Sequence, residues 1–208
     1  MRPNFAVAIT LLVLIMLAAE LLSWGPLLEY RRPLLTSEPW RLITGHFMHL
    51  SLVHAMLNCV ALLLLGRLFA DRLRVGETWL VLGAAPLLIS LAFWVALPEL
   101  TWYRGLSGTL HALYFAGCVV WMASTAGRDR WLPVAALLVG VIKVLLEQPW
   151  DASFPFRQWL GAAIVPQAHL IGTVIGLGAG LGFAVARSKR GSAMHLGNKS
   201  GADRRNDV

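Results

Sequence analysis

Gly105-Leu106-Ser107-Gly108 and Ala168-His169-Leu170-Ile171-Gly172 are two stretches that lie far apart in the sequence, each inside a long apolar run. Nucleophilic and ionisable side chains are costly at membrane depth and usually serve a function there. A serine between glycines and a histidine at the start of a glycine-rich segment therefore predict a nucleophile and its base.

The apolar runs around these stretches indicate an integral membrane protein. Hydrophobic residues make up 57% of the 208 residues and charged residues only 14%, whereas a soluble domain carries about 25% charged residues. A helix needs roughly 20 apolar residues to cross a bilayer. Six segments approach this length: Phe5–Leu22, Gly45–Leu65, Thr78–Leu97, Leu106–Ala126, Trp131–Leu146 and Gln167–Ala186. We therefore expect an all-α membrane protein with one six-helix domain over residues 1–186.

The net charge of +7 is explained by membrane topology without a nucleic-acid partner. Basic residues follow the second, fourth and sixth segments, and the opposite loops hold fewer of them. Because cytoplasmic loops are enriched in Lys and Arg, both termini are expected in the cytoplasm. Residues 187–208 are polar and basic, which predicts a disordered cytoplasmic tail close to anionic lipid.

The first segment has some features of a cleaved signal peptide. Its apolar stretch is longer than that of most signal peptides, and Glu20 interrupts the expected cleavage zone. We therefore interpret it as a retained signal anchor. Cys59 and Cys118 fall within spans and form no C-x-x-C pattern, so a thiolate metal site is not expected.

Ser107 is expected at the start of the fourth helix. A helix N-terminus carries unpaired N–H groups and positive partial charge, which can stabilise a developing oxyanion. Gly105 and Gly108 would let a substrate backbone approach closely. Taken alone, this G-x-S-G pattern is more typical of a serine that caps a helix.

His169 lies on one helical face with Gly172, Gly176 and Gly180. A stripe of small residues lets membrane helices pack closely. If the neighbouring helix is the fourth, an imidazole nitrogen reaches the hydroxyl of Ser107. The alternative is a packing stripe whose histidine only forms a hydrogen bond between helices.

A third set of polar residues lies in the second segment. His54 and Asn58 are one helical turn apart, so both side chains point the same way and both can donate to an oxyanion. His46 and His49 have a spacing that also occurs in metal or haem sites. No acidic residue accompanies them in this segment and no C-x-x-C-H occurs, so neither a metal nor another cofactor is predicted.

Together these features resemble the rhomboid intramembrane serine proteases. The resemblance covers almost the whole chain: Trp40-Arg41 in the first outer loop, H-x4-H-x3-N at His49, His54 and Asn58, G-x-S-G at Gly105–Gly108, and A-H-x-x-G-x-x-x-G at Ala168–Gly176. It implies a rhomboid-like six-helix bundle in which Ser107 is the nucleophile and His169 the general base, a dyad without an aspartate. It also implies an oxyanion hole of His54, Asn58 and the Ser107 N–H, and a structural role for Trp40 and Arg41.

One position departs from the family pattern. Many rhomboids carry a tyrosine four residues after the serine, where it stacks on the catalytic imidazole, and this chain has His111 there. Tyr114 follows one turn later on the same face. We hypothesise that His111 either stacks on His169 or forms a hydrogen bond that orients it.

The run Tyr103-Arg104-Gly105-Leu106-Ser107-Gly108, followed by His111, resembles the rhombosortase branch. That branch is associated with processing of C-terminal Gly-Gly anchor segments of exported bacterial proteins. The resemblance implies a location in the bacterial inner membrane with a site open to the periplasmic face. The expected partners are the lipid bilayer and transmembrane or C-terminally anchored protein substrates.

The fifth segment predicts a route into the site. Its 16-residue helix falls several Å short of a hydrocarbon core of ~30 Å, and we expect it to form a side gate with the loop over residues 147–166. Lys143 and Glu147 lie one turn apart at its end and are interpreted as a structural ion pair.

Two other classes of function stay open from the sequence. One is an inactive rhomboid-like protein that binds transmembrane clients. The other is a transporter or haem carrier that uses the histidines.

Overall fold

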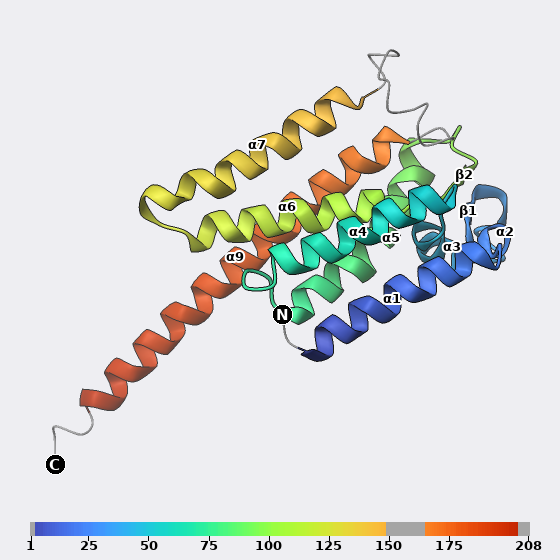
Figure 1. The fold of residues 1–208 in the computed structure, drawn as a ribbon. Coiled ribbons are helices and arrows are strands. Elements are labelled where there is room, and N and C mark those ends of the chain that lie inside the picture. The colour runs from blue at the N-terminus through green and yellow to red at the C-terminus, as the bar shows by residue number, and fades with distance from the viewer. Residues whose placement is uncertain (1–2, 149–164, 204–208) are drawn as a thin grey trace.

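A computed structural model describes residues 3–148 and 165–203, with side chains described from Asn4 to Arg190 outside the gap. Figure 1 shows a helical bundle in which the site-bearing ends of α6 and α9 lie at the same end. The helices are α1 (Pro3–Leu21), α2 (Gly25–Leu28), α3 (Arg41–Thr44), α4 (Leu52–Leu68), α5 (Val75–Ala96), α6 (Ser107–Ser124), α7 (Trp131–Leu146) and α9 (Pro166–Asp203). The strands β1 (Tyr30–Arg31) and β2 (Trp102–Tyr103) pair antiparallel, and 3-10 turns cover Arg32–Leu34, Gly45–Phe47 and Gly127–Arg130.

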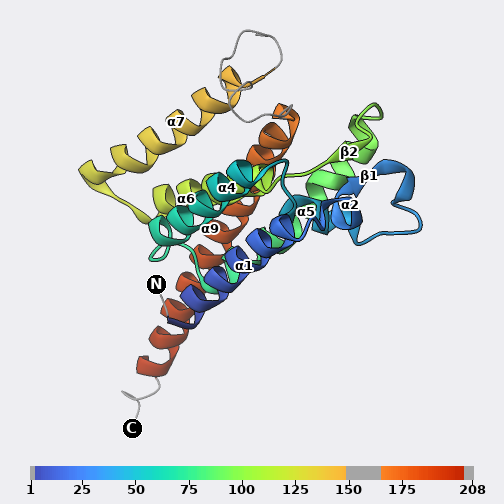
Figure 2. The same ribbon diagram turned by 45° about the vertical axis from the view of Figure 1, so that its right-hand side comes forward.

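Helix α6 forms the centre of the bundle. Side chains all round it, among them Leu113, Phe115 and Cys118, are fully buried. Helices α4, α5, α7 and α9 all pack against it, and α7 lies on the opposite side of the bundle from α1 (Figures 1 and 2). A helix that is apolar on every side is typical of such a central position.

Helices α6 and α9 pack with their backbones in contact. A Cβ atom on Gly172 would collide with the carbonyl oxygen of Gly108, and one on Gly176 would collide with the carbonyl oxygen of Ala112. The glycine stripe predicted from the sequence therefore lies against the fourth predicted segment. This close approach brings the start of α9 to the start of α6.

The surface of the bundle is apolar in the manner of a membrane protein. Large hydrophobic side chains such as Ile15, Leu64, Val95 and Val139 are more than half exposed, which is unusual in a soluble monomer. Among the described residues, three helices are long and apolar enough to cross a membrane: Asn4–Leu21, Val75–Ala96 and Pro166–Arg190. A fourth is counted if Arg41–Phe47 and Leu52–Leu68, which meet at 93°, form one broken span.

A helix occupies most of each of the six predicted segments, and two of the predicted bounds differ from the observed ones by more than three residues. The second helix begins at Leu52 rather than Gly45, because Ser51 caps it by accepting a hydrogen bond from the His54 N–H at 3.2 Å. Helix α9 continues beyond Ala186 to Asp203, where a disordered tail was expected. Residues 187–203 contain no proline, which is the residue that would interrupt the helix. The domain boundary at residue 186 stays a prediction.

The loop after α1 is tied to the α5–α6 connection. Tyr30 pairs with Tyr103 in the small sheet. Arg32 donates to the carbonyl oxygens of Phe93, Trp94 and Leu97, which lie at the C-terminal end of α5. These contacts fix the connection that leads directly into α6.

Arg41 holds the same loop from inside. Its guanidinium is almost fully buried, pairs with Glu38, and donates to the carbonyl oxygens of Pro26 and Glu29 at 3.1 and 3.0 Å. The neighbouring Trp40 is half exposed. These bonds let Arg41 hold the loop together. Among the described residues, the side chain of Trp40 forms no hydrogen bond of this kind.

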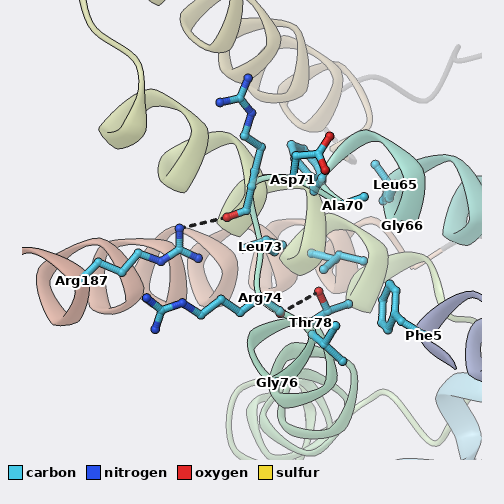
Figure 3. A pocket seen from close by; sticks show the side chains of 14 residues that line it. Phe5, Leu65, Gly66, Ala70, Asp71, Leu73, Arg74, Gly76, Thr78 and Arg187 are labelled. Atoms are coloured by element: carbon cyan, nitrogen blue, oxygen red, sulfur yellow. Dashed lines mark hydrogen bonds between the residues drawn. The ribbon is translucent and has the colours of Figure 1, made fainter. Parts of the chain in front are cut away.

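A hollow of about 530 Å³ lies at the other end of the bundle, where the α4–α5 connection meets α1 and α9. Arg187 of α9 points towards this hollow and donates to the Arg72 carbonyl oxygen at 3.0 Å (Figure 3). Its guanidinium also pairs with Glu77. These bonds anchor α9 to the start of α5 far from Ser107.

Candidate active site

Ser107 and His169 meet where α6 and α9 begin. Ser107 is the first residue of α6, His169 lies in the first turn of α9, and the Oγ of Ser107 is 2.8 Å from the Nε2 of His169. The helices reach this distance because Gly108 leaves room: a Cβ there would lie 2.8 Å from the Ala168 carbonyl oxygen. The structure thus brings together the two residues that the sequence singled out.

Gly105 shapes the turn that leads into α6. Its φ of +146° is a conformation that side-chain-bearing residues rarely adopt. The Tyr103 hydroxyl donates to its carbonyl oxygen at 2.7 Å and holds the turn. As a result Ser107 lies at a helix N-terminus, where first-turn N–H groups have no partner within the helix.

His54 and Asn58 face the same space from α4. The Cε1 of His54 would lie 3.2 Å from a Cβ on Gly105. The Leu50 N–H donates to His54 Nδ1 at 3.5 Å, so a neutral His54 carries its proton on Nε2 and keeps that donor available. Asn58 donates one amide hydrogen to the His54 carbonyl oxygen at 2.9 Å, and the other has no acceptor among the residues that the structure describes.

His46 and His49 are buried behind this site. His46 Nε2 lies 3.0 Å from the Ser90 hydroxyl, and His49 has no hydrogen-bond partner for either ring nitrogen among the described residues. The Arg104 guanidinium instead binds the His49 carbonyl oxygen at 3.3 Å. Neither histidine belongs to a cluster with the spacing of metal ligands in the described ranges 3–148 and 165–203.

His111 stacks on His169. The two rings are 4.3 Å apart between centroids and inclined by only 13°. His111 Nδ1 lies 2.7 Å from the Ser107 carbonyl oxygen, to which it must donate because a carbonyl only accepts. Of the two arrangements considered for His111, the stacked one is present. The hydrogen bond from the Nδ1 of His111 goes to Ser107 and not to His169.

Tyr114 lies one turn beyond His111 and contacts α7. Its hydroxyl donates to the Ala136 carbonyl oxygen at 2.5 Å, and its ring lies against Gly140. Tyr114 therefore connects α6 to α7. In the described part of the chain it forms neither a ring contact nor a hydrogen bond with His169.

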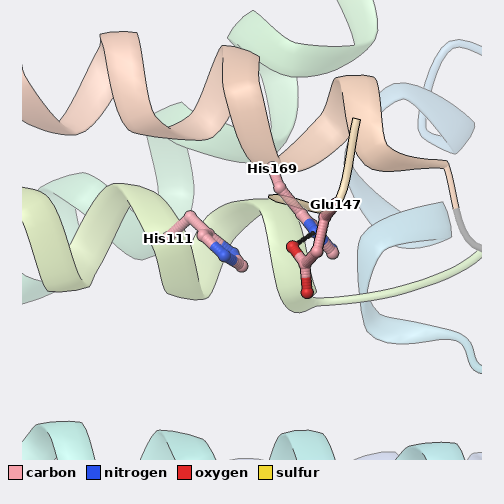
Figure 4. Close-up of side chains that lie close together, drawn as sticks. All are labelled: His111, Glu147 and His169. Carbon is pink, nitrogen blue, oxygen red and sulfur yellow. Dashed lines mark hydrogen bonds and ion pairs between the residues drawn. The ribbon is translucent and has the colours of Figure 1, made fainter. Parts of the chain in front are cut away.

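Glu147 is a site residue that the sequence analysis treated as purely structural. Its ion pair with Lys143 is present, at 2.7 Å between Oε1 and Nζ. The second carboxylate oxygen, Oε2, lies 2.8 Å from His169 Nδ1 (Figure 4). The sequence did contain an indication of this role. The fifth segment was expected to end on the side of the membrane where the fourth and sixth begin, so Glu147 lies at the same depth as Ser107 and His169.

The carboxyl group of Glu147 is held in its charged form. Glu147 lies just beyond the end of α7, where burial alone would raise its pKa. The hydrogen bonds and charges of His169 and Lys143 outweigh burial and lower the pKa to about 2. The site therefore contains a carboxylate next to the imidazole at neutral pH.

A cleft of about 680 Å³ opens beside these residues. One part of its wall is polar and is lined by His54, Asn58, Ser107, His111, Lys143, Glu147 and His169. Apolar side chains of α4 and α7 form much of the remainder, among them Leu57, Ala61, Leu64 and Val139. A cleft of this kind can hold an extended apolar segment next to a nucleophile.

Comparison with known proteins identifies the family of the chain. Residues 36–186 match the family model described as Rhomboid domain, which is well over half of the chain. The chain belongs to the rhomboid family. Two relatives of this rhomboid are the proteins named rhomboid protease GlpG from Salmonella choleraesuis (strain SC-B67) and Salmonella paratyphi A (strain ATCC 9150 / SARB42). Each is 28% identical over 148 residues, which cover 70% of this chain and 49% of the relative. The present rhomboid therefore spans about half the length of these relatives.

Proposed function

We propose that this rhomboid is an intramembrane serine protease that uses Ser107 as nucleophile and His169 as general base. The observation that carries the proposal is the 2.8 Å contact between Ser107 Oγ and His169 Nε2 at the wall of the cleft. The similarity to proteins named rhomboid proteases supports it.

The chemistry follows from the positions of these groups. Ser107 Oγ attacks the scissile carbonyl carbon and passes its proton to His169 Nε2. The negative charge that develops on the carbonyl oxygen is stabilised by the Ser107 N–H, by His54 Nε2–H and by the free amide hydrogen of Asn58. His169 then returns the proton to the leaving amine, and an ester to Ser107 remains. Water, deprotonated by His169, hydrolyses this ester and restores the serine.

The proposed substrates are transmembrane or C-terminal anchor segments of exported proteins. A helix in the bilayer has its backbone hydrogen bonds satisfied, so it must unwind before a carbonyl can meet Ser107. Glycine favours this opening. The rhombosortase-like run from Tyr103 to Gly108 and the stacked His111 support the narrower proposal that Gly-Gly anchors are processed.

We place the enzyme in the bacterial inner membrane as six spans with both termini in the cytoplasm. The site then opens towards the periplasm, because Ser107, His169 and Glu147 all lie at the ends of their helices that the charge pattern assigns to the outer side.

Substrate entry is proposed between α4 and α7, whose apolar side chains form the wall of the cleft. A cross-linker that joins cysteines introduced at Leu64 and Val139, in a background without Cys59 and Cys118, should abolish cleavage of membrane-borne substrates. The same protein treated with a reagent that caps the two cysteines singly is the control. Undiminished cleavage after complete cross-linking would contradict this route.

A labelling experiment tests the catalytic proposal. The purified protein in liposomes should react covalently with a fluorophosphonate and should cut an exported protein that carries a Gly-rich C-terminal anchor, with the cut located by mass. Ser107→Ala should abolish both reactions. Ser124→Ala, the same change at the far end of α6, should leave them unchanged. A wild-type protein that binds the anchor but shows no labelling or cleavage would instead be an inactive client-binding member of the family.

A further inference from the structure

We infer that Glu147, held by Lys143, is a positioning residue for His169 and completes a Ser107–His169–Glu147 relay. The inference rests on the proposed function of Ser107 and His169. Three helices contribute to the relay: α6 supplies Ser107, α9 supplies His169, and the C-terminal end of α7 supplies Glu147.

The contacts form an unbroken line. Ser107 Oγ lies 2.8 Å from His169 Nε2, and His169 Nδ1 lies 2.8 Å from Glu147 Oε2. The other carboxylate oxygen, Oε1, binds Lys143 Nζ at 2.7 Å. His169 is 5% exposed and Glu147 18% exposed, so water competes little for the bond between them.

This line determines where the imidazole carries its proton. A carboxylate only accepts hydrogen bonds, so His169 Nδ1 must be the donor to Glu147. A neutral imidazole then has its lone pair on Nε2, which faces the hydroxyl of Ser107. That is the tautomer a general base needs.

Glu147 keeps its charge throughout the step. When the Oγ–H bond of Ser107 breaks, the proton goes to His169 Nε2 and the electron pair on Oγ forms the bond to the scissile carbon. The imidazolium that results lies beside a carboxylate, which stabilises it. No proton moves to Glu147, so the balance needs no further reactant.

The same side chains could be viewed as a metal site, because ligand atoms of His111, Glu147 and His169 lie within 4.8 Å of one another (Figure 4). The Lys143 ammonium argues against this view. It lies 2.7 Å from Glu147 Oε1 and 3.0 Å from His111 Nε2, so a positive charge is already bound to two of the three groups.

Both ring nitrogens of His111 form hydrogen bonds that are compatible with the relay. Its Nδ1 donates to the Ser107 carbonyl oxygen, so its Nε2 is free to accept from Lys143. The polar hydrogens of Ser107, His111 and His169 therefore all have acceptors without a metal ion, and two of the three ammonium hydrogens of Lys143 have them as well. The stacked ring of His111 also restricts rotation of His169.

Glu147→Gln tests the relay because Lys143 determines the orientation of the amide. Lys143 can only donate, so it binds the amide oxygen and turns the NH₂ group towards His169 Nδ1. His169 must then accept at Nδ1 and carry its proton on Nε2, which is the wrong tautomer. By analogy with the loss measured when the buried acid of a serine-protease triad becomes an amide, kcat should fall by about 10²–10⁴-fold, with KM within a few-fold of wild type. Glu20→Gln, the same change on α1, is the matched control.

A second variant separates positioning from mere structural damage. In Lys143→Met combined with Glu147→Gln, the amide is free to turn its oxygen towards His169 Nδ1. The double variant should therefore be at least about tenfold faster than Glu147→Gln alone. A double variant as slow as the single one, or slower, would overturn the role assigned to Lys143 and the carboxylate.

Two readouts give the decisive outcomes. Nitrogen-15 NMR of histidine-labelled protein, with the His169 signals assigned by His169→Gln, should show the proton on Nδ1 in the wild type and on Nε2 in Glu147→Gln. The fluorophosphonate labelling rate of Ser107 should fall with kcat. If the wild type labels and Glu147→Gln labels at the same rate with the same tautomer, the relay is wrong although the protease is real. If the wild type does not label at all, the proposed function itself has failed.

Discussion

Gly108→Ala is the change that most directly tests whether backbone contact between α6 and α9 builds the site. Gly108 lies between Ser107 and the body of α6, and a Cβ added there would be 2.8 Å from the Ala168 carbonyl oxygen. An ordinary contact of a Cβ atom begins at 3.4 Å. Because the obstructing atom belongs to the backbone and cannot rotate away, the two helices must move apart by about 0.6 Å to restore an ordinary contact.

That separation acts on the bond between Ser107 and His169. Their 2.8 Å contact would lengthen towards about 3.4 Å, beyond the usual range for a hydroxyl donor. A displacement approaching 1 Å at a catalytic pair can cost about 10²-fold in rate, so we expect kcat to fall by about 10–10²-fold. Overpacking should also lower the free energy of unfolding by about 1–3 kcal/mol.

The assay is single-turnover cleavage in liposomes together with the fluorophosphonate labelling rate. Gly178→Ala is the matched control, because a Cβ at Gly178 meets nothing within 4 Å. It should retain wild-type rates and stability, or gain slightly from the higher helix propensity of alanine. If Gly108→Ala also keeps its kcat within about twofold, close backbone packing is not what aligns the pair, and this reasoning is refuted.

Further changes test the groups around the pair. His111→Ala should slow kcat by roughly tenfold because His169 loses its stacked neighbour, while His111→Tyr should restore most of the rate; equal turnover and pH profile in His111→Ala and wild type would remove this role. His54→Ala and Asn58→Ala should each lower kcat by about 10²–10³-fold if they stabilise the oxyanion, and a change confined to KM in single-turnover assays would contradict that. Arg41→Ala should lower the free energy of unfolding by about 2–3 kcal/mol, because buried carbonyl groups and Glu38 lose their partner; thermal denaturation should show the loss, and an unchanged midpoint would argue against the anchoring role.

Local sequence patterns were enough to predict the helices and to single out the side chains of Ser107 and His169. Each apolar segment contains a helix, and the stripe Gly172 to Gly176 identified the face of α9 that contacts α6. These features depend on residues three or four apart, which a single sequence displays directly. The start of α4 was misplaced because the turn before Ser51 contains Phe47, Met48 and Leu50, which continue the apolar pattern of the helix backwards.

The acid next to His169 could not be found in the same way. Glu147 lies 22 residues before His169, on a different helix, and its nearer partner Lys143 offered a sufficient local explanation. Only the arrangement of α6, α7 and α9 shows that one carboxylate reaches both the lysine and the imidazole. Residues 149–164, which belong to the loop that was expected to form a side gate with the fifth helix, lie outside the described part of the chain.

The ion pair at the end of α7 also explains how a carboxylate can be kept beside an imidazole at this depth. An isolated charge in or near hydrocarbon is costly, and the cost falls when it is paired and hydrogen-bonded. Lys143 cancels the charge of Glu147 and lies one helical turn before it, so the two are already neighbours when α7 forms. Removing Lys143 alone should therefore destabilise the protein more than replacing both residues with methionine, since the single change leaves a partly buried carboxylate without its lysine partner. Unfolding midpoints of the two variants in the same detergent would decide the order, and the reverse order would mean that Glu147 does not depend on Lys143.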